Sequence, residues 1–269
     1  MNLKDILVHI DNRPTCSSRL NVAMQLAKQQ NARLTGLYVI PHPYFAPHHR
    51  DPQELADEAQ QRFLQATAPS GLETAWICVD NLKTGLDLPN ALNLHAHYHD
   101  LLVVSQTDYD APDRTIPPSL PEKAVLGSGR PVLIVPYAGE FKTLGKRTML
   151  AWRGGPESSR ALHDALPLLR SAEAIQVISI QGRGGDEAFK SHNADICEHL
   201  KRYELPISSE KLNAGDLSVG DLLLNRCADQ GIDLLVMGAF SQSRRGHQTL
   251  GEVGTYLLEF MTVPVLMSH

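Results

Sequence analysis

At 269 residues the chain is long enough for one large domain or two ordinary ones. Hydrophobic residues make up 42% of it and charged residues 20%, which is typical of a globular protein with a sizeable core. The net charge of −5 argues against non-specific nucleic-acid binding, and no apolar run approaches the roughly 20 residues that a membrane-spanning helix needs.

The N-terminal residues and the cysteines indicate the cell compartment. Met1-Asn2-Leu3-Lys4 leads straight into the apolar run Ile6-Leu7-Val8, without the build of a signal peptide. The four cysteines lie far apart and form no Cys-x-x-Cys or metal-finger spacing. We therefore expect a cytoplasmic protein with reduced thiols and with neither a membrane nor a nucleic-acid partner.

In the first half of the chain, short apolar runs alternate with segments whose apolar residues recur at helical spacing. Strands are expected near 6–10, 34–40, 74–79, 101–105 and 132–135. Helices are expected near 18–30, 52–68 and 88–97, with a short one from 120. Alternating strands and helices predict a parallel sheet covered on both faces.

The second half repeats this alternation. Strands are expected near 148–152, 175–180, 207–212, 234–237 and 265–267, and helices near 156–170, 186–203, 219–230 and 252–261. A turn-rich link at 137–145 separates the halves, so we expect domains at 1–140 and 145–269.

The two halves also share sequence. Asp100-Leu-Leu-Val-Val-Ser105 recurs as Asp233-Leu-Leu-Val-Met-Gly238, and Pro131-Val-Leu-Ile-Val135 recurs as Pro264-Val-Leu-Met-Ser268. Both pairs have an offset of 133, so the segments between them are equally long. The sequence thus predicts a duplicated α/β domain, with two tandem doubly wound parallel sheets of five strands each.

The last strand–loop–helix segment suggests a phosphate site. The apolar run 234–237 ends at Gly238 and is followed by a polar loop, 241–251, with Arg244, Arg245 and His247. A helical pattern then begins at Glu252. The N-terminus of a helix binds anions because its first N–H groups and its dipole point at the preceding loop.

The spacing of this segment resembles the universal stress protein family. Nucleotide-binding members carry Gly-x-x-Gly, nine residues, and then Gly-Ser/Thr. Here Gly238-Ala-Phe-Ser241 is followed by nine residues and Gly251-Glu252, so Ser241 and Glu252 depart from the pattern. The resemblance covers the whole chain, and it implies a strand order of 3-2-1-4-5 with a ligand crevice where that order reverses, between strands 1 and 4.

The resemblance implies an adenine nucleotide, ATP or AMP with Mg²⁺, in the second half. Adenosine would lie near the end of strand 1, and the phosphates would lie on the glycine loop. Glu252 would either repel the phosphates or hold the Mg²⁺ that neutralises them. The candidate residues are Trp152, Arg153, Ile180, Met237, Gly238, Ser241, Gly251, Glu252, Val253 and Gly254.

The first half keeps a different part of the family pattern. Asp11 matches the acidic residue that the family places at the end of strand 1, whereas Arg153 stands there in the second half. The phosphate loop is degenerate, because Pro118 replaces Gly251 and the loop carries Asp108, Asp110 and Asp113. We expect no nucleoside triphosphate in this half. Ser119 and Glu122 match a capping box for the helix that follows.

Other polar groups are better explained by structural roles. Ser17, Ser18, Ser158 and Ser159 are expected to cap helices rather than to act as nucleophiles. Two histidine groups lack the spacing and the cysteines that would favour a metal site, so none is expected. These groups are His42, His48 and His49, and His95, His97 and His99.

Three functions remain open at this stage. They are a stress-response regulator that senses an adenine nucleotide, an interaction protein with two degenerate sites, and a slow ATPase. For the ATPase, no catalytic base is evident in the sequence. Because family dimers pair their apolar fifth strands, the resemblance also implies an intrachain pseudo-dimer, to which a homodimer of whole chains would be an addition. The protein partner is not identified by the sequence.

Overall fold

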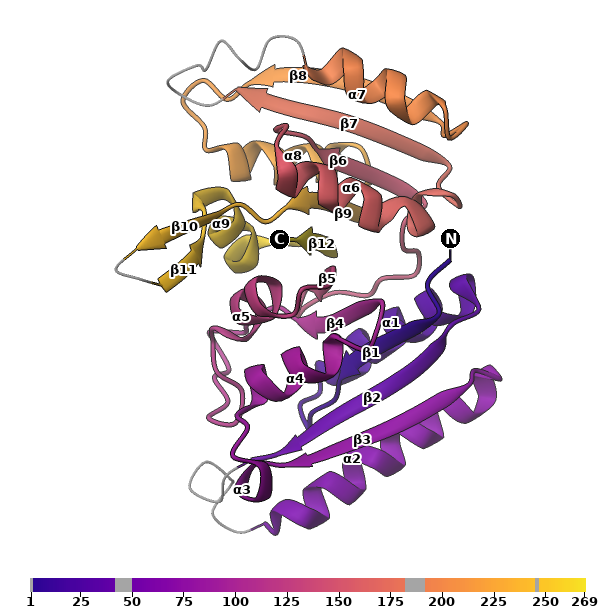
Figure 1. Cartoon of the computed structure of the whole chain (residues 1–269), viewed down its shortest axis with the longest axis vertical. Coiled ribbons are helices and arrows are strands. Elements are labelled where there is room, and N and C mark those ends of the chain that lie inside the picture. The colour runs from indigo at the N-terminus through magenta and orange to yellow at the C-terminus, as the bar shows by residue number, and fades with distance from the viewer. Residues whose placement is uncertain (1, 42–49, 182–191, 245–246) are drawn as a thin grey trace. The chain divides into compact units, whose positions relative to one another are not determined.

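A computed structural model of the chain describes residues 2–41, 50–181, 192–244 and 247–269 (Figure 1). The chain divides into two compact units, Met1–Glu140 and Phe141–His269. No helix in the described ranges is long and apolar enough to cross a membrane.

Unit 1 is a parallel sheet of five strands with helices in the connections (Figure 1). The strands follow the order β3-β2-β1-β4-β5 across the sheet. In chain order its elements are β1 (Asp5–His9), α1 (Cys16–Gln30), β2 (Arg33–Ile40), α2 (Pro52–Thr67), a short 3₁₀ turn (Ala68–Ser70), β3 (Thr74–Asp80), α3 (Asn81–Thr84), α4 (Leu88–Ala96), β4 (Leu101–Ser105), α5 (Leu120–Gly127) and β5 (Val132–Val135).

Unit 2 repeats this plan with the strand order β8-β7-β6-β9-β12. Its elements are β6 (Arg147–Ala151), α6 (Pro156–Leu169), β7 (Ala174–Gln181), α7 (His192–Lys201), β8 (Ile207–Asn213), α8 (Val219–Asp229), β9 (Leu234–Gly238), β10 (Ser241–Arg244), β11 (His247–Leu250), α9 (Glu252–Phe260) and β12 (Val265–Ser268). The predicted α/β class and the order 3-2-1-4-5 are confirmed in each unit.

The inner strands of both units are almost completely buried. Val103 of β4 and Val236 of β9 have no exposed surface, because helices cover both faces of each sheet. Apolar surface removed from water contributes roughly 25 cal/mol per Å², so burial of these runs stabilises the fold. Burial on both faces explains why the strands are continuous apolar runs without alternation.

The repeated aspartates hold strand 1 of each unit. The Asp100 carboxylate accepts hydrogen bonds from the backbone N–H groups of Lys4 and Asp5, at 2.7 and 3.1 Å. Asp233 accepts from Lys146 and Arg147 in the same way, at 3.2 and 3.0 Å. In both units, the aspartate that begins the repeat Asp-Leu-Leu-Val thus links the loop before the fourth strand to the start of the first strand by hydrogen bonds.

The loop predicted at 241–251 contains a β-hairpin. Strands β10 and β11 pair antiparallel, from Ser241 opposite Leu250 to Arg244 opposite His247. The polar composition of β10, Ser-Gln-Ser-Arg, lacks the alternating apolar residues that mark a half-buried strand, so sequence patterning missed it. Part of the backbone of the loop on which the phosphates were expected to lie is therefore hydrogen-bonded across the hairpin.

The expected serine caps are wrong. Helix α1 is preceded by Thr15 and helix α6 by Gly155, so the Ser-Ser pairs lie inside the first turns of their helices. The Ser17 hydroxyl donates to the carbonyl of Pro14 at 2.8 Å instead. Ser119 does precede helix α5, but its side chain makes no capping hydrogen bond, so this arm of the predicted capping box is also absent.

Gly238 is predicted to be essential for the packing of α6 on β9. A Cβ atom there would lie 2.5 Å from backbone atoms of Glu157 and Ser158, which cannot move without shifting the helix. We expect Gly238→Ala to lower the free energy of unfolding by about 1–3 kcal/mol, the usual cost of overpacking. Gly254→Ala is the control, because its Cβ would meet only Leu250 side-chain atoms at 3.5 Å or more. Equal stability of the two variants in urea unfolding would contradict this packing.

Candidate ligand sites

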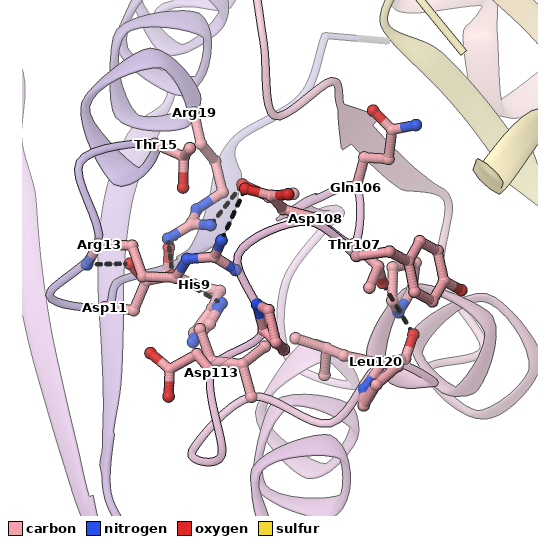
Figure 2. A pocket seen from close by; sticks show the side chains of 16 residues that line it. His9, Asp11, Arg13, Thr15, Arg19, Gln106, Thr107, Asp108, Asp113 and Leu120 are labelled. Atoms are coloured by element: carbon pink, nitrogen blue, oxygen red, sulfur yellow. Dashed lines mark hydrogen bonds and ion pairs between the residues drawn. The ribbon is translucent and has the colours of Figure 1, made fainter. Parts of the chain in front are cut away.

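In unit 1, a hollow opens at the carboxyl ends of β1 and β2, with residues of α2, the start of α4 and residues 111–116 around it. It has a volume of about 590 Å³. A smaller adjoining space continues beneath the loop between β4 and α5 (Figure 2). The larger hollow, called here the unit 1 hollow, is lined by His9, Ile10, Asp11, Asn12, Arg13, Tyr38, Val39, Pro41, Leu55, Leu88 and residues 111–116.

A buried ion pair forms the floor of this region. The Arg19 guanidinium of α1 donates to an oxygen of the Asp11 carboxylate at 2.9 Å, and only 1% of the Arg19 side chain is exposed. Arg19 also donates to the carbonyl of His9 and to the hydroxyl of Ser105, at 2.6 and 2.5 Å. The second Asp11 oxygen accepts from the Arg13 backbone N–H at 2.8 Å. Burial is the largest single influence on the pKa of Asp11 and raises it. The positive charge of Arg19, together with the hydrogen bonds from Arg13 and Arg19, nevertheless holds that pKa below the ordinary value.

Unit 2 has no such pair at the equivalent position. Ile6 pairs with Leu101, and Thr148 pairs with Leu234, which is the counterpart of Leu101 in the sequence repeat. The first strands of the two units therefore correspond with an offset of 142 residues. The same offset matches Arg19 with Ala161. Ala161 is small and fully buried, and helix α6 comes so close to β9 that only glycine fits at 238. In unit 1 the guanidinium of Arg19 lies between α1 and β4 instead, against Ser105.

The loop between β4 and α5 uses its donors internally. Asp108 accepts from the N–H groups of Asp110 and Ala111, both at 3.1 Å, and Asp113 accepts from the N–H of Thr115 at 2.8 Å. The carbonyl of Pro118 accepts from the Thr107 hydroxyl (Figure 2). These contacts support the expectation that this loop does not bind a polyphosphate.

Arg13 ties this loop to the β1–α1 loop. Its guanidinium donates to the Asp108 carboxylate at 3.0 Å (Figure 2). It also donates to the carbonyl of Ala111 at 2.9 Å. Both side chains are largely buried, with 17% of Arg13 and 12% of Asp108 exposed. Arg13 thereby holds the β1–α1 loop and the β4–α5 loop together over the carboxyl end of the sheet, beside the unit 1 hollow.

His9 is the least satisfied polar side chain of this region. It is 2% exposed, and its Nδ1 atom is buried without a hydrogen-bond partner among the described residues. The nearest carboxylate oxygen, on Asp11, lies 3.9 Å away, which is beyond a hydrogen bond. Burial and the charge of Arg19 lower the pKa of His9 to about 3, so the imidazole is neutral near neutral pH.

In unit 2 the structure brings several of the predicted residues together. Ala151 at the end of β6 pairs with Met237 of β9, which places Trp152 and Arg153 beside Gly238. The Arg153 guanidinium lies over the ring of Phe240, 5.2 Å from its centroid. The backbone N–H of Trp152 donates to the carbonyl of Ile178, two residues before Ile180 on β7.

The start of α9 lies against the same group of residues. The Gly251 N–H donates to the carbonyl of Phe240 at 2.8 Å, so this donor is already occupied. Gly251 precedes the helix, and Glu252, Val253 and Gly254 form its first turn, whose N–H groups a helix leaves without internal partners. Glu252 is exposed. Ser241 begins β10, and the side chains of 241–248 are outside the part of the chain described here.

The indole of Trp152 has a buried donor without a partner. Its Nε1 atom has no hydrogen-bond partner among the residues that the structure describes, whereas its carbonyl accepts from the Ser179 hydroxyl at 2.6 Å. Such orphaned buried donors are rare in folded proteins and call for a specific explanation.

The histidine groups show structural contacts. His99 is buried and its Nδ1 lies 2.8 Å from the carbonyl of His95, while its Nε2 is 3.6 Å from Asp5. Within the described ranges, no three His, Cys, Asp or Glu residues gather in a way that could hold a metal. His42, His48 and His49 lie outside the described residues.

Comparison with solved structures identifies the fold. A universal stress protein from Archaeoglobus fulgidus matches 98% of this chain over 97% of its own, with a TM-score of 0.74 and 14% sequence identity. The chain has the universal stress protein fold. A functionally unknown protein from Pseudomonas aeruginosa matches 99% of the chain over 92% of its own, with a TM-score of 0.66 and 16% identity. No protein-family model and no curated protein matches the sequence.

Several residues that sequence patterning did not select lie near the points where the strand order of this fold reverses. Arg19, His9 and Arg13 are the main ones in unit 1. The triplet Ser17-Ser18-Arg19 recurs as Ser158-Ser159-Arg160, but the repeat hides a difference, because Arg160 is exposed and lies 3.9 Å from Asp164 on its own helix. Only the fold shows that one arginine is buried and the other is not.

Removal of the buried guanidinium is expected to be costly. Arg19→Met leaves the Asp11 carboxylate buried without its charge partner, and we expect the free energy of unfolding to fall by about 3–5 kcal/mol. Arg160→Met is the matched control, with an expected change within about 0.5 kcal/mol because the residue is exposed. Urea unfolding of both variants tests this, and a cost for Arg19→Met as small as for Arg160→Met would contradict the role of the pair.

His9 is expected to make the fold sensitive to mild acid. Its pKa is lowered in the folded state, so between about pH 6.5 and pH 3 the unfolded state binds a proton that the folded state excludes. Stability therefore falls as pH decreases through this window, by about 1.4 kcal/mol per pH unit at most. We expect His9→Gln to remove up to about 2 kcal/mol of the loss between pH 6.5 and pH 5. Equal losses in wild type and variant would show that His9 is not held neutral.

Proposed function

We propose that the chain is a tandem universal stress protein, a cytoplasmic regulatory module in stress response that senses an adenine nucleotide through its second unit. The proposal rests on the shared fold and on the grouping of the predicted residues at the switch point between β6 and β9. In open α/β sheets, ligands bind outside the carboxyl ends of the strands at such a point.

The buried Trp152 donor is the observation that carries this proposal. Its Nε1–H lies at the end of β6 without an acceptor among the described residues. An adenine ring offers acceptor nitrogens, and one of them would satisfy this N–H group if the side chains that cover it move aside on binding. The exposed Arg153, stacked on Phe240, would flank the nucleotide on the side of the glycine-bearing segment.

The phosphates would bind at the start of α9. The N–H groups of Glu252, Val253 and Gly254 point out of the first turn, and the dipole of the helix favours an anion there. Gly154 and Gly155 adopt φ angles of 80° and 88°, so the backbone after β6 is open to a close approach. The Glu252 carboxylate fits as an oxygen ligand for Mg²⁺ bound to the phosphates, which would supply charge neutralisation.

Two alternatives remain. An interaction protein without a nucleotide is favoured by the hairpin β10–β11, which pairs backbone groups of the segment between Gly238 and Gly251. An ATPase would need a base near the γ-phosphate. Glu252 is the one carboxylate of the first turn of α9, and its place beside the phosphates suits a metal ligand better than a base.

Two variants test the site by titration of the full chain with ATP, with and without Mg²⁺. Trp152→Phe keeps the aromatic ring but removes the orphaned donor, so we expect ATP affinity to fall about fivefold, the value of one neutral hydrogen bond. Glu252→Ser removes a charge and restores the hydroxyl of the family pattern. If repulsion dominates, this change tightens binding about fivefold. If Glu252 holds Mg²⁺, the change weakens binding and abolishes its Mg²⁺ dependence.

Val39→Trp in the unit 1 hollow serves as the control, since it leaves the second unit unchanged. Absence of ATP binding by the wild-type chain would overturn the nucleotide proposal in favour of the interaction protein. Unchanged affinity in Trp152→Phe would place any nucleotide away from β6.

A further inference from the structure

We propose that the outer edge of β3 binds a second copy of this chain, with the two β3 strands paired antiparallel around Ile77. This edge includes none of the residues that line the unit 1 hollow. The inference is also independent of the nucleotide site proposed in unit 2, because it rests on other residues and on another kind of partner.

Strand β3 is the outermost strand of unit 1 and pairs with β2 on one side only (Figure 1). The N–H of Leu34 donates to the carbonyl of Glu73 at 2.9 Å, so Glu73 and every second residue after it turn their backbone groups toward β2. The N–H and C=O groups of Thr74, Trp76 and Cys78 therefore point away from the sheet. These groups bond to no residue in the part of the chain that the structure describes.

The sequence of β3 lacks the features that usually protect an edge strand. Thr-Ala-Trp-Ile-Cys-Val-Asp contains no lysine, arginine or proline, and its one charged residue is the last, Asp80. Cys78 is exposed, while Trp76 and Ile77 are half-buried. An apolar edge strand with unpaired backbone groups is a template for pairing with another strand.

The corresponding end strand of unit 2 is protected. Strand β8, Ile-Ser-Ser-Glu-Lys-Leu-Asn, has Glu210 and Lys211 near its centre. Glu210 accepts from the Arg226 guanidinium at 2.7 Å, and Lys211 is exposed. Charged side chains, lysine above all, discourage a second strand from pairing along such an edge. The same position in the fold is thus guarded in unit 2 and left open in unit 1.

The sequence of β3 is complementary to a second copy of itself. In an antiparallel pair centred on Ile77, Trp76 lies opposite Cys78 of the second copy and Thr74 lies opposite Asp80, so no two charges oppose each other. The outward N–H and C=O groups of the two strands then meet in hydrogen-bonded pairs. This arrangement has two-fold symmetry and closes on itself, so it leads to a dimer and not to a fibre.

Proline at an edge residue tests this surface. Because the N–H of Cys78 points outward, Cys78→Pro removes no hydrogen bond from the sheet of unit 1 but removes a donor to the second copy. Sedimentation of the full chain over a concentration series should show a dimer, which Cys78→Pro weakens at least tenfold. Ser209→Pro in β8 is the matched control, since the bond from the Ile175 N–H to the Pro206 carbonyl shows that Ser209 also points outward. It should leave the dimer unchanged.

Two further changes separate pairing from folding. Cys78→Lys adds a charge at an exposed position and should also weaken the dimer at least tenfold, whereas Cys78→Ser should preserve it. Urea unfolding shows whether each variant is folded.

A disulfide tests the register. Ile77→Cys in the Cys78→Ser background should cross-link two chains on treatment with oxidised glutathione. Residues directly opposite in a non-hydrogen-bonded antiparallel pair have Cα atoms about 4.5 Å apart, which a disulfide can span. Ala75→Cys in the same background should not cross-link, because residue 75 lies opposite Val79.

Three outcomes would overturn the proposal. The first is a wild-type chain that stays monomeric at roughly 100 μM, where a homodimer with a micromolar Kd would be largely formed. The edge would then be open to a strand of a different protein. The second is a dimer that survives both Cys78→Pro and Cys78→Lys, and the third is cross-linking through residue 75 in place of residue 77. None of these results bears on ATP binding to unit 2.

Discussion

The buried pair of Arg19 and Asp11 is the interaction on which the arrangement of the strand ends in unit 1 depends. It joins the start of α1 to the ends of β1 and β4, since the same guanidinium also bonds the His9 carbonyl and the Ser105 hydroxyl. Taking two charges out of water costs several kcal/mol each, and only such complete hydrogen bonding offsets that cost. The acidic residue that the family pattern places beside a nucleotide is thereby committed to an internal partner.

The two units of the universal stress protein fold have diverged around one geometry. In unit 2, Ala161 and Gly238 allow α6 to pack directly on β9, and Arg153 and Glu252, in the first turn of α9, are exposed. In unit 1, charge pairs and an acidic, self-bonded loop occupy the corresponding places. The two units thus differ in the charges and hydrogen-bond donors that they place at the ends of their central strands.

Sequence patterning predicted the α/β class and the alternation of elements, because two-sided burial of a parallel sheet leaves a strong mark in runs such as 101–105 and 234–238. The strand order followed from the family resemblance and not from the pattern itself. It missed the hairpin β10–β11, whose polar strands have no apolar alternation. It also missed the roles of Arg19 and His9. An arginine in a helical pattern is normally exposed, and only tertiary packing shows that Arg19 is buried while Arg160 is not.

The central claim is that unit 2 binds an adenine nucleotide and unit 1 does not, and the stoichiometry of ATP binding tests it most directly. Calorimetric titration of the full chain with Mg²⁺ and ATP should give one site per chain. ATP binding to the Ile116→Trp variant should keep both its stoichiometry and its affinity. Two equivalent sites per chain, or the loss of ATP binding when the unit 1 hollow is filled, would contradict the account.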